Sequence, residues 1–402
     1  MILTVMSQPR VTLFELFGCF LKLGCISFGG PVAHLGFFRA EFVERRRWMS
    51  DGDYADLVAL CQFLPGPASS QVGYAIGLRE GGLWGGMAAW LGFTLPSAIL
   101  MIGFALGLAE LGDVSQAGWI VGLKLAAVAV VAHALWGMAQ KLCPDRDRAL
   151  LALGAAAFLT VVSGAIWQVA VIAVGGVLGW LLFRGKIEAK IDALESEGAK
   201  SWGPGWAWLV MFGAGLLGLP IWAANQPESM VAVVDGFYRA GSLVFGGGHV
   251  VLPLLDSVTV GRGWIGSDAF LAGYGAAQAL PGPLFAFSSF LGTAINTGPG
   301  GISGGILALV ATYVPSWLLL LGVLPYWNRL RRLAGAQAAL RGANAVVVGL
   351  LLAAFFNPIW ATAVTSTDRL AFALLAFGAL KFGRLPPWAL VAICAGAGAL
   401  VF

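Results

Sequence analysis

Four cations lie within otherwise apolar stretches of this 402-residue chain, and they form two pairs at matching places in an internal repeat. Lys22 and Arg239 each stand six residues before a Phe-Gly-Gly sequence, and Lys124 and Arg341 form the second pair. A cation at the centre of a bilayer costs about 2.5–3.5 kcal/mol on insertion scales, so it is seldom kept there without a role. The pattern predicts an anion-binding site. The alternative is that these side chains extend to the membrane surface.

Two carboxylates and two histidines near the first cation pair could cancel its charges or exchange protons. The first carboxylate lies seven residues before Lys22, about two helical turns away on the same face. The second lies four residues before Arg239, a spacing that favours an ion pair within one helix. Each histidine follows a glycine motif and could accept a proton or make a structural hydrogen bond. These candidates for proton coupling are Glu15, Asp235, His34 and His249.

Glycine motifs also repeat, and they predict helix starts whose backbone N–H groups could bind an oxyanion. Phe-Gly-Gly occurs at 28–30 and 245–247, and Leu-Pro-Gly-Pro occurs at 64–67 and 280–283. Close packing of helices is the alternative explanation for such glycines. A glutamine precedes each Pro-Gly-Pro break, where it could donate to an oxyanion or satisfy the broken backbone. The predicted substrate-binding residues are Lys22, Arg239, Lys124, Gly29, Gly30, Gly246, Gly247, Gln62, Gly66, Gln278 and Gly282.

The composition is that of a membrane protein. The chain is 59% hydrophobic and 11% charged, with a mean hydropathy of +0.84. Soluble globular proteins carry roughly 25% charged residues, and a chain of this length could not hide so much apolar surface from water. The clearest apolar runs, near 81–109, 115–140 and 300–327, each reach the roughly 20 residues needed to cross a bilayer. We therefore expect an all-α, polytopic integral membrane protein in contact with lipid.

A polar, charge-balanced stretch divides the chain into two homologous helical halves. We expect an N-terminal half at 1–184, a linker at 185–204 with a short amphipathic helix at 187–197, and a C-terminal half at 205–402. The segment 205–224 has no counterpart in the first half, and an unpaired helix between two copies would reverse the second copy. Loop charges favour this inverted topology, because acidic residues follow the first long apolar run whereas arginines follow its partner.

Each half is also predicted to contain a re-entrant helix-break-helix hairpin around its Pro-Gly-Pro sequence. Each arm has about 12 residues, which is too short to span a bilayer. Irregular backbone at membrane depth is tolerated only where it lines a cavity or is buried in protein. The predicted arms are 51–63, with Ser50 or Asp51 as N-cap, and 68–79 in the first half, and 267–280 and 284–296 in the second.

The sequence contains no zinc-protease, nucleophile-elbow, phosphate-loop or dinucleotide motif, so we expect no enzyme activity, no cofactor and no metal. The five cysteines show no C-x-x-C spacing, which favours a packing role. No soluble segment is long enough for the nucleotide-binding domain of an ATP-driven pump. No basic-aromatic surface segment indicates nucleic acid. A secondary carrier is therefore favoured over an intramembrane enzyme or scaffold.

The combined motifs resemble the chromate ion transporter (CHR) family in its long, two-domain form. The first copy carries Phe28-Gly29-Gly30-Pro31 with His34 and Trp48, followed by Gln62-Phe63-Leu64-Pro65-Gly66-Pro67. The second copy carries Phe245-Gly246-Gly247-Gly248-His249 and Leu280-Pro281-Gly282-Pro283. It lacks the proline after Phe-Gly-Gly, so the two motif loops should not be treated as equivalent. The resemblance covers nearly the whole chain.

The resemblance implies a secondary transporter that exports chromate, a tetrahedral oxyanion dianion, across the bacterial inner membrane and gives chromate resistance. It implies that the membrane potential or a proton gradient drives export, and that the two domains are oppositely oriented. The alternatives are a transporter for sulfate or another oxyanion and an anion channel on the same scaffold. Sulfate is also a tetrahedral dianion of similar size, and sequence does not separate conduction from alternating access. The oligomeric state, including a homodimer, also stays open.

Overall fold

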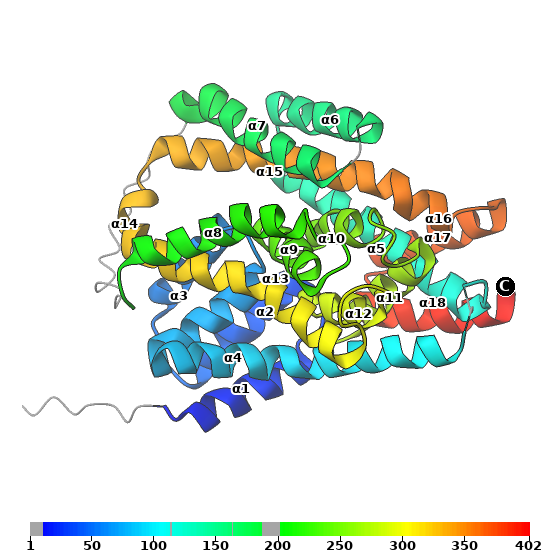
Figure 1. Ribbon diagram of the computed structural model, residues 1–402, viewed down its shortest axis with the longest axis horizontal. Coiled ribbons are helices and arrows are strands. Elements are labelled where there is room, and N and C mark those ends of the chain that lie inside the picture. Colours follow the sequence, from blue (N-terminus) through cyan, green and yellow to red (C-terminus); the bar gives the residue numbers. More distant parts are fainter. Residues whose placement is uncertain (1–10, 113–114, 163, 187–201) are drawn as a thin grey trace, which may run out of the picture.

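The computed structural model describes residues 11–112, 115–162, 164–186 and 202–402, and every regular element in these ranges is a helix (Figure 1). Six of the described helices are long and apolar enough to cross a membrane. They are α4 (Ala68–Glu110), α5 (Gly118–Leu142), α7 (Ala165–Phe183), α8 (Gly205–Ala223), α13 (Gly301–Val323) continued to Leu330, and α15 (Ala334–Ala354) continued to Ala363. The prediction of an all-α, polytopic membrane protein is confirmed.

The first half opens with α1 (Leu13–Ile26) and α2 (Gly30–Arg39), which are separated by the Phe-Gly-Gly motif. Gly29 is the N-cap of α2 with a φ of 99°, a left-handed conformation that favours glycine, and Pro31 lies in the first turn as expected. The remaining elements are the π-helix η1 (Ala40–Arg45), α3 (Asp51–Phe63), α4, α5, α6 (Arg146–Val161), α7 and the short 3-10 helix η2 (Arg184–Lys186).

The second half repeats this order after α8, the helix that has no counterpart in the first half. It comprises α9 (Met230–Ser242), η3 (Gly248–Val250), α10 (Val251–Thr259), α11 (Ser267–Ala279), η4 (Leu284–Ala286), α12 (Phe287–Ala294), α13, η5 (Leu324–Tyr326), α14 (Trp327–Leu330), α15, η6 (Phe355–Trp360), α16 (Ala361–Ala363), α17 (Thr367–Lys381) and α18 (Pro387–Val401). Most of the predicted linker, including the amphipathic helix expected at 187–197, lies outside the described residues.

The arms of the predicted hairpins are present as helices. The first arm, α3, has the predicted bounds, and Ser50 caps it by accepting a hydrogen bond from the Asp53 N–H at 3.1 Å. The second arm is the first part of α4. This part ends at a kink, where Gly81 and Gly82 leave the helical conformation. In the second half, α11 and α12 flank the break at the corresponding place.

Glycine pairs allow each second arm to pack directly on the helix that follows it. A Cβ on Gly77 would collide with the carbonyl oxygen of Gly85, and a Cβ on Gly292 would collide with that of Gly304. The two contacts occupy matching places in the repeat. The chain can therefore turn back at close range only because these positions have no side chain.

The break in each hairpin is hydrogen-bonded to the opposite half. The Gly66 N–H donates to the Val244 carbonyl at 2.7 Å, and the Gly282 N–H donates to the Ser27 carbonyl at 2.9 Å. Ser27 and Val244 are themselves counterparts, since each follows the first helix of its half and directly precedes Phe-Gly-Gly. Each half thus supplies a carbonyl acceptor for a backbone N–H group at the helix break of the other half.

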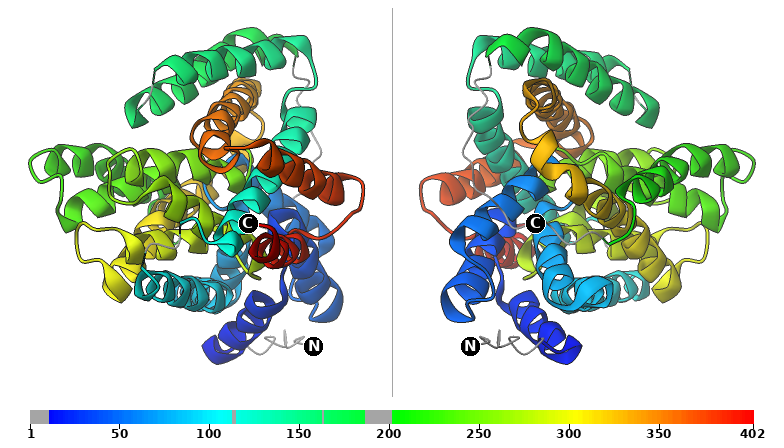
Figure 2. Two further views of the ribbon diagram at one scale, coloured as in Figure 1. Left: turned by 90° about the vertical axis from the view of Figure 1, so that its right-hand side faces the viewer. Right: turned by 90° about the vertical axis from the view of Figure 1, so that its left-hand side faces the viewer.

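The last helices of each half are also exchanged. α17 and α18 of the second half pack on α5 of the first, whereas α6 and α7 of the first half pack on α15 of the second. Figure 2 shows α6 and α7 lying across α15. Both crossings are close: a Cβ on Gly122 would collide with the Cys394 carbonyl, and one on Gly179 would meet the Ala338 carbonyl at 2.6 Å. The halves therefore interlock.

Corresponding helices of the two halves run in opposite directions along the long axis of the molecule. In Figure 1, α4 leads to the right-hand end, whereas its counterpart α13 leads to the left-hand end. Likewise α15 runs from left to right and α5 from right to left. Arg331, directly after α14, is ion-paired with Asp56 of α3 at 2.5 Å, and this pair joins the two halves.

The geometry at the breaks leads us to expect that Gly66→Ala and Gly282→Ala destabilise the protein by similar amounts. Both glycines have positive φ, 122° and 92°, and a Cβ on either would meet a serine side-chain atom of the opposite half at 3.0 Å. Strained backbone of this kind costs about 1–3 kcal/mol. The measurement is the melting temperature of purified protein in detergent. Gly36→Ala is the control, because a Cβ there meets nothing within 4 Å. Equal melting temperatures for all three variants would contradict the expectation.

Candidate functional site

A polar cavity of about 710 Å³ lies in the second half, between the end of α8, the start of α9 and the loop that follows α10. We call it the arginine cavity. Its lining is mixed, with prolines and alanines on the α8 side and polar groups elsewhere. The charged and polar lining residues are Glu228, Asp235, Arg239, Arg262, Asn296 and Thr297.

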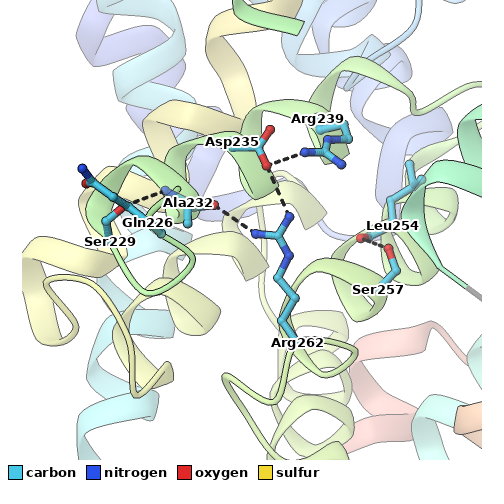
Figure 3. Close-up of polar contacts among 8 residues, drawn as sticks. All are labelled: Gln226, Ser229, Ala232, Asp235, Arg239, Leu254, Ser257 and Arg262. Carbon is cyan, nitrogen blue, oxygen red and sulfur yellow. Dashed lines mark hydrogen bonds and ion pairs between the residues drawn. The ribbon is translucent and has the colours of Figure 1, made fainter. Parts of the chain in front are cut away.

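Asp235 lies between two arginines at the wall of this cavity (Figure 3). Its side chain is only 2% exposed, and it forms an ion pair with Arg239 one turn along α9. Arg262 approaches the same carboxylate oxygen from the loop after α10, with its Nη2 at 3.3 Å. The predicted pair of Asp235 and Arg239 is confirmed, and Arg262 is a second partner that the sequence analysis missed.

We call Asp235, Arg239 and Arg262 the Asp235 cluster. Its charges are not balanced and its hydrogen-bond donors are not all paired. Two guanidinium groups share one carboxylate, so the cluster carries one net positive charge. The Nε of Arg239 is buried and has no hydrogen-bond partner among the described residues. Arg262 adds only a long hydrogen bond of 3.4 Å to the Ala232 carbonyl. Spare donors and surplus positive charge beside a polar cavity favour binding of an anion.

Arg262 is held by a turn that occurs in both halves. In Arg262-Gly263-Trp264 the middle residue has a φ of 72° and the guanidinium lies over the tryptophan ring at 5.0 Å. In Arg46-Arg47-Trp48 the middle residue has a φ of 56° and the corresponding distance is 5.1 Å. The signal that could have revealed Arg262 is therefore this repeated Arg-x-Trp sequence, which recurs at the offset of the Pro-Gly-Pro motifs.

Arg46, the counterpart of Arg262 in the first half, has different partners. Arg46 is ion-paired with Glu15 of α1 and with Glu41 of η1, each at 2.6 Å. Burial raises the pKa of the Glu41 carboxyl, but hydrogen bonds from Arg45 and Arg46 outweigh burial and lower that pKa below its ordinary value. This network lies near the surface and is fully paired.

Lys22 lies away from the arginine cavity. It is exposed on α1 and is not among the cavity-lining residues. The predicted pairing of Lys22 with Glu15 is wrong, because Glu15 is bound to Arg46. Seven residues also correspond to about 10.5 Å along a helix, whereas the Arg46 guanidinium is in direct contact. Lys22 and Arg239 occupy matching motif positions but are not brought together in one cavity.

Lys124 joins the two halves. Its side chain is 1% exposed, and its Nζ donates to Asp268 at the start of α11 at 2.6 Å and to the Ser115 carbonyl at 2.9 Å. It does not line the arginine cavity. Its counterpart Arg341 is exposed on α15. The second cation pair therefore differs between the halves, and Lys124 has the contacts of a structural ion pair.

The predicted backbone donors fall into two groups. The N–H groups of Gly66 and Gly282 are already used by the opposite half, so this structure does not leave them free for an anion. This corrects the expectation that they face substrate. The Phe-Gly-Gly glycines Gly29, Gly246 and Gly247 are exposed and Gly30 is half-buried. The two motif loops lie close together, since a Cβ on Gly248 would be 3.5 Å from the Pro31 ring.

The predicted glutamines and histidines also differ between the halves. Gln62 is exposed, whereas Gln278 is half-buried and its Nε2 is buried without a partner among the described residues. His34 is fully buried, and its ring nitrogens contact Ser69 Oγ and the Ser27 carbonyl, each at 3.2 Å. Because the Ser27 carbonyl also accepts from Gly282, His34 supports the contact between the halves. His249 contacts Tyr274.

Comparison with known proteins places this membrane protein among transporters. The family described as "Chromate transporter" matches residues 14–180 and 231–399. A chromate transport protein of Pseudomonas aeruginosa is 29% identical over 365 residues, which cover 85% of this chain and 80% of that protein. A chromate transport protein of Cupriavidus metallidurans is 26% identical over 364 residues, with 87% and 84% covered. No solved structure matches the chain.

The chain belongs to the chromate transporter family. The family match excludes the linker and α8, and each matched stretch contains one Phe-Gly-Gly and one Pro-Gly-Pro motif. The resemblance inferred from those motifs is confirmed.

The Asp235 cluster leads us to expect that Asp235→Asn is less stable than the parent protein but gains more stability from a bound oxyanion. Loss of the carboxylate leaves two arginines unpaired beside the cavity, which costs about 1–3 kcal/mol for a partly solvated pair. An added dianion such as sulfate then replaces the missing charge. The measurement is the melting temperature with and without sulfate. Asp368→Asn, which changes an exposed carboxylate, is the control. Equal sulfate responses in both variants would contradict anion binding at the cluster.

Proposed function

We propose that this chain is a secondary transporter that exports chromate across the bacterial inner membrane and thereby gives chromate resistance, and that it is not an enzyme. The names of its relatives support chromate as substrate. The observation that carries the proposal is the position of Asp235, whose carboxylate occupies the space between two arginine side chains at the wall of a polar cavity. A carboxylate held in this way stands where an oxyanion would bind.

A tetrahedral dianion suits this arrangement better than the carboxylate does. It brings two negative charges to two guanidinium groups, whereas Asp235 brings one. Its oxygens point in four directions, so it can accept from both arginines at once, and the planar guanidinium can donate two parallel hydrogen bonds. The buried Nε of Arg239 is one donor available for it. Asp235 then competes with substrate, so release follows when the carboxylate returns.

We further propose that the halves, 1–184 and 205–402 with a linker at 185–204, have inverted topology in the membrane. Three observations support this: the opposite directions of α4 and α13, the reciprocal hydrogen bonds of Gly66 and Gly282, and the separate family match to each copy. Inverted repeats bind substrate near their interface and expose it alternately to the two sides. The arginine cavity, which lies in the second copy, is then a route to that interface.

The test is flux of radiolabelled chromate into inside-out membrane vesicles. Arg239→Gln and Arg262→Gln should each reduce the initial rate by about 10- to 100-fold, because one lost charge-assisted contact is worth roughly 1.5–3 kcal/mol. Lys22→Gln should cause a smaller loss, because Lys22 is exposed and outside the cavity. The control is Arg369→Gln, whose half-buried side chain contacts Thr365 and Gln116.

The same vesicles test the alternatives. Excess sulfate should slow chromate uptake only weakly if chromate is the substrate, and an uncoupler should abolish uphill uptake by a carrier. Full rates in both cavity variants, with normal amounts of folded protein, would overturn the role of the Asp235 cluster. Downhill flux without uphill accumulation would identify a channel instead.

A further inference from the structure

A second buried polar group lies between the two halves, and it shares no residue with the arginine cavity. The Nδ1 of His249, two residues after the second Phe-Gly-Gly, is hydrogen-bonded with the hydroxyl of Tyr274 on α11 at 2.8 Å. Tyr274 is fully buried and also shares a hydrogen bond with Gln278. His133 of α5 interacts electrostatically with His249. We call these four residues the histidine–tyrosine chain.

The contact with Tyr274 distinguishes the two ring nitrogens of His249. The Nε2 of Gln278, one turn from Tyr274 along α11, is buried and has no hydrogen-bond partner among the described residues. The Nδ1 of His249 is 2.8 Å from the Tyr274 hydroxyl oxygen, and in the tautomer that carries the proton on Nδ1 the ring donates to that oxygen. This leaves Nε2 of His249 as the nitrogen that can take a proton, and no hydrogen bond to it is found within the described ranges.

The histidine–tyrosine chain contains buried polar atoms without hydrogen-bond partners, which a purely structural network would not need. The Nδ1 of His133 is buried without a partner in the described part of the molecule, as is Nε2 of Gln278. An unpaired buried polar atom costs about 1–3 kcal/mol, so such atoms call for an explanation. Titratable side chains that remain inside a membrane protein are typical of proton pathways.

Few other titratable side chains pack around His249 that could exchange a proton in its place. Against η3, which carries His249, pack α10, α15 and η4. α10 carries Asp256, whose Oδ1 is buried without a described partner, α15 carries Arg341, and η4 is apolar. On the far side, Lys381 of α17 acts on His133. The groups around a proton on His249 therefore include Lys381, which lies beyond His133, and the carboxyl of Asp256 on the neighbouring helix α10.

Three members of the histidine–tyrosine chain, His249, Tyr274 and Gln278, belong to the second half, and the first half has no equivalent of their contact. The positions that correspond to His249, Tyr274 and Gln278 are Val32, Val58 and Gln62, and Gln62 is exposed. If these residues served only to pack the hairpin, we would expect them in both copies. The restriction to one copy indicates a task that the transporter performs once in each cycle.

We infer that His249 takes up and releases, at its Nε2, the proton that is exchanged for the exported anion, and that Tyr274 holds the imidazole in the required tautomer. The inference rests on the proposed function. In the step itself, the Nε2 lone pair of neutral His249 accepts a proton to give the imidazolium, which keeps its Nδ1–H bond to Tyr274. Loss of the same proton restores the neutral ring. His249 is thus a coupling residue and Tyr274 a positioning residue.

The experiment uses purified full-length protein in liposomes that contain a pH-sensitive dye. Two fluxes are measured, exchange of labelled for unlabelled chromate at equal pH, and chromate movement driven by a pH gradient with its dye signal. His249→Gln should keep exchange within about twofold of the parent rate but lower gradient-driven flux by about 10-fold or more, with no dye signal. Tyr274→Phe should keep both fluxes and shift their pH profile, because the imidazole loses its tautomer partner.

Tyr54→Phe is the matched control, since Tyr54 is a buried tyrosine on α3, the helix that corresponds to α11, and its hydroxyl donates to the Leu35 carbonyl at 2.7 Å. It should leave the pH profile unchanged. A His249→Gln protein with the parent dye signal would overturn the inference, and so would a Tyr274→Phe profile identical to that of Tyr54→Phe. Parent protein that exchanges chromate without any proton signal would also overturn it. Failure of parent protein to exchange chromate at all would instead refute the proposed function.

Discussion

The structure depends on how the backbone groups of two broken helices are satisfied inside a membrane protein. A break at membrane depth exposes N–H and C=O groups where there is no water to pair with them. Here each half closes the break of the other: Gly66 donates to Val244, and Gly282 donates to Ser27. Neither half can make these bonds alone. The interlocking of the last helices with α5 and α15 extends the same dependence over the whole molecule.

This mutual dependence frees the two copies to diverge elsewhere. The first copy turns its Arg-x-Trp arginine, Arg46, toward paired surface carboxylates. The second turns Arg262 toward Asp235 and opens a polar cavity beside it. The second copy alone also carries the buried contact of His249 with Tyr274. Anion binding and proton exchange are thus proposed for one copy, while the other supplies the opposing scaffold against which it moves.

Local features of this protein follow from its sequence, whereas contacts between the halves do not. The bounds of α3, its Ser50 cap and the pair of Asp235 with Arg239 are set by residues within one helical turn, so spacing alone predicts them. The partner of Gly66 is Val244, far away in the chain, and only the packed fold brings it there. Lys22 was expected to act with Arg239 because the motifs match, but Lys22 is not among the residues that line the arginine cavity. Sequence symmetry therefore predicted the scaffold better than the site.

The opposite orientation of the two interlocked halves is tested most directly by labelling corresponding loops from each side of the membrane. Glu44 of η1 and Gly266 before α11 are exposed, and a Cβ on Gly266 would meet nothing within 4 Å. In a cysteine-free background, Glu44→Cys should react with a membrane-impermeant maleimide only in inside-out vesicles, because it directly precedes the cluster Arg45, Arg46 and Arg47, which the positive-inside rule assigns to the cytoplasm. Gly266→Cys should react only in intact cells whose outer surface is accessible. Labelling of both cysteines from the same side would contradict the inverted arrangement.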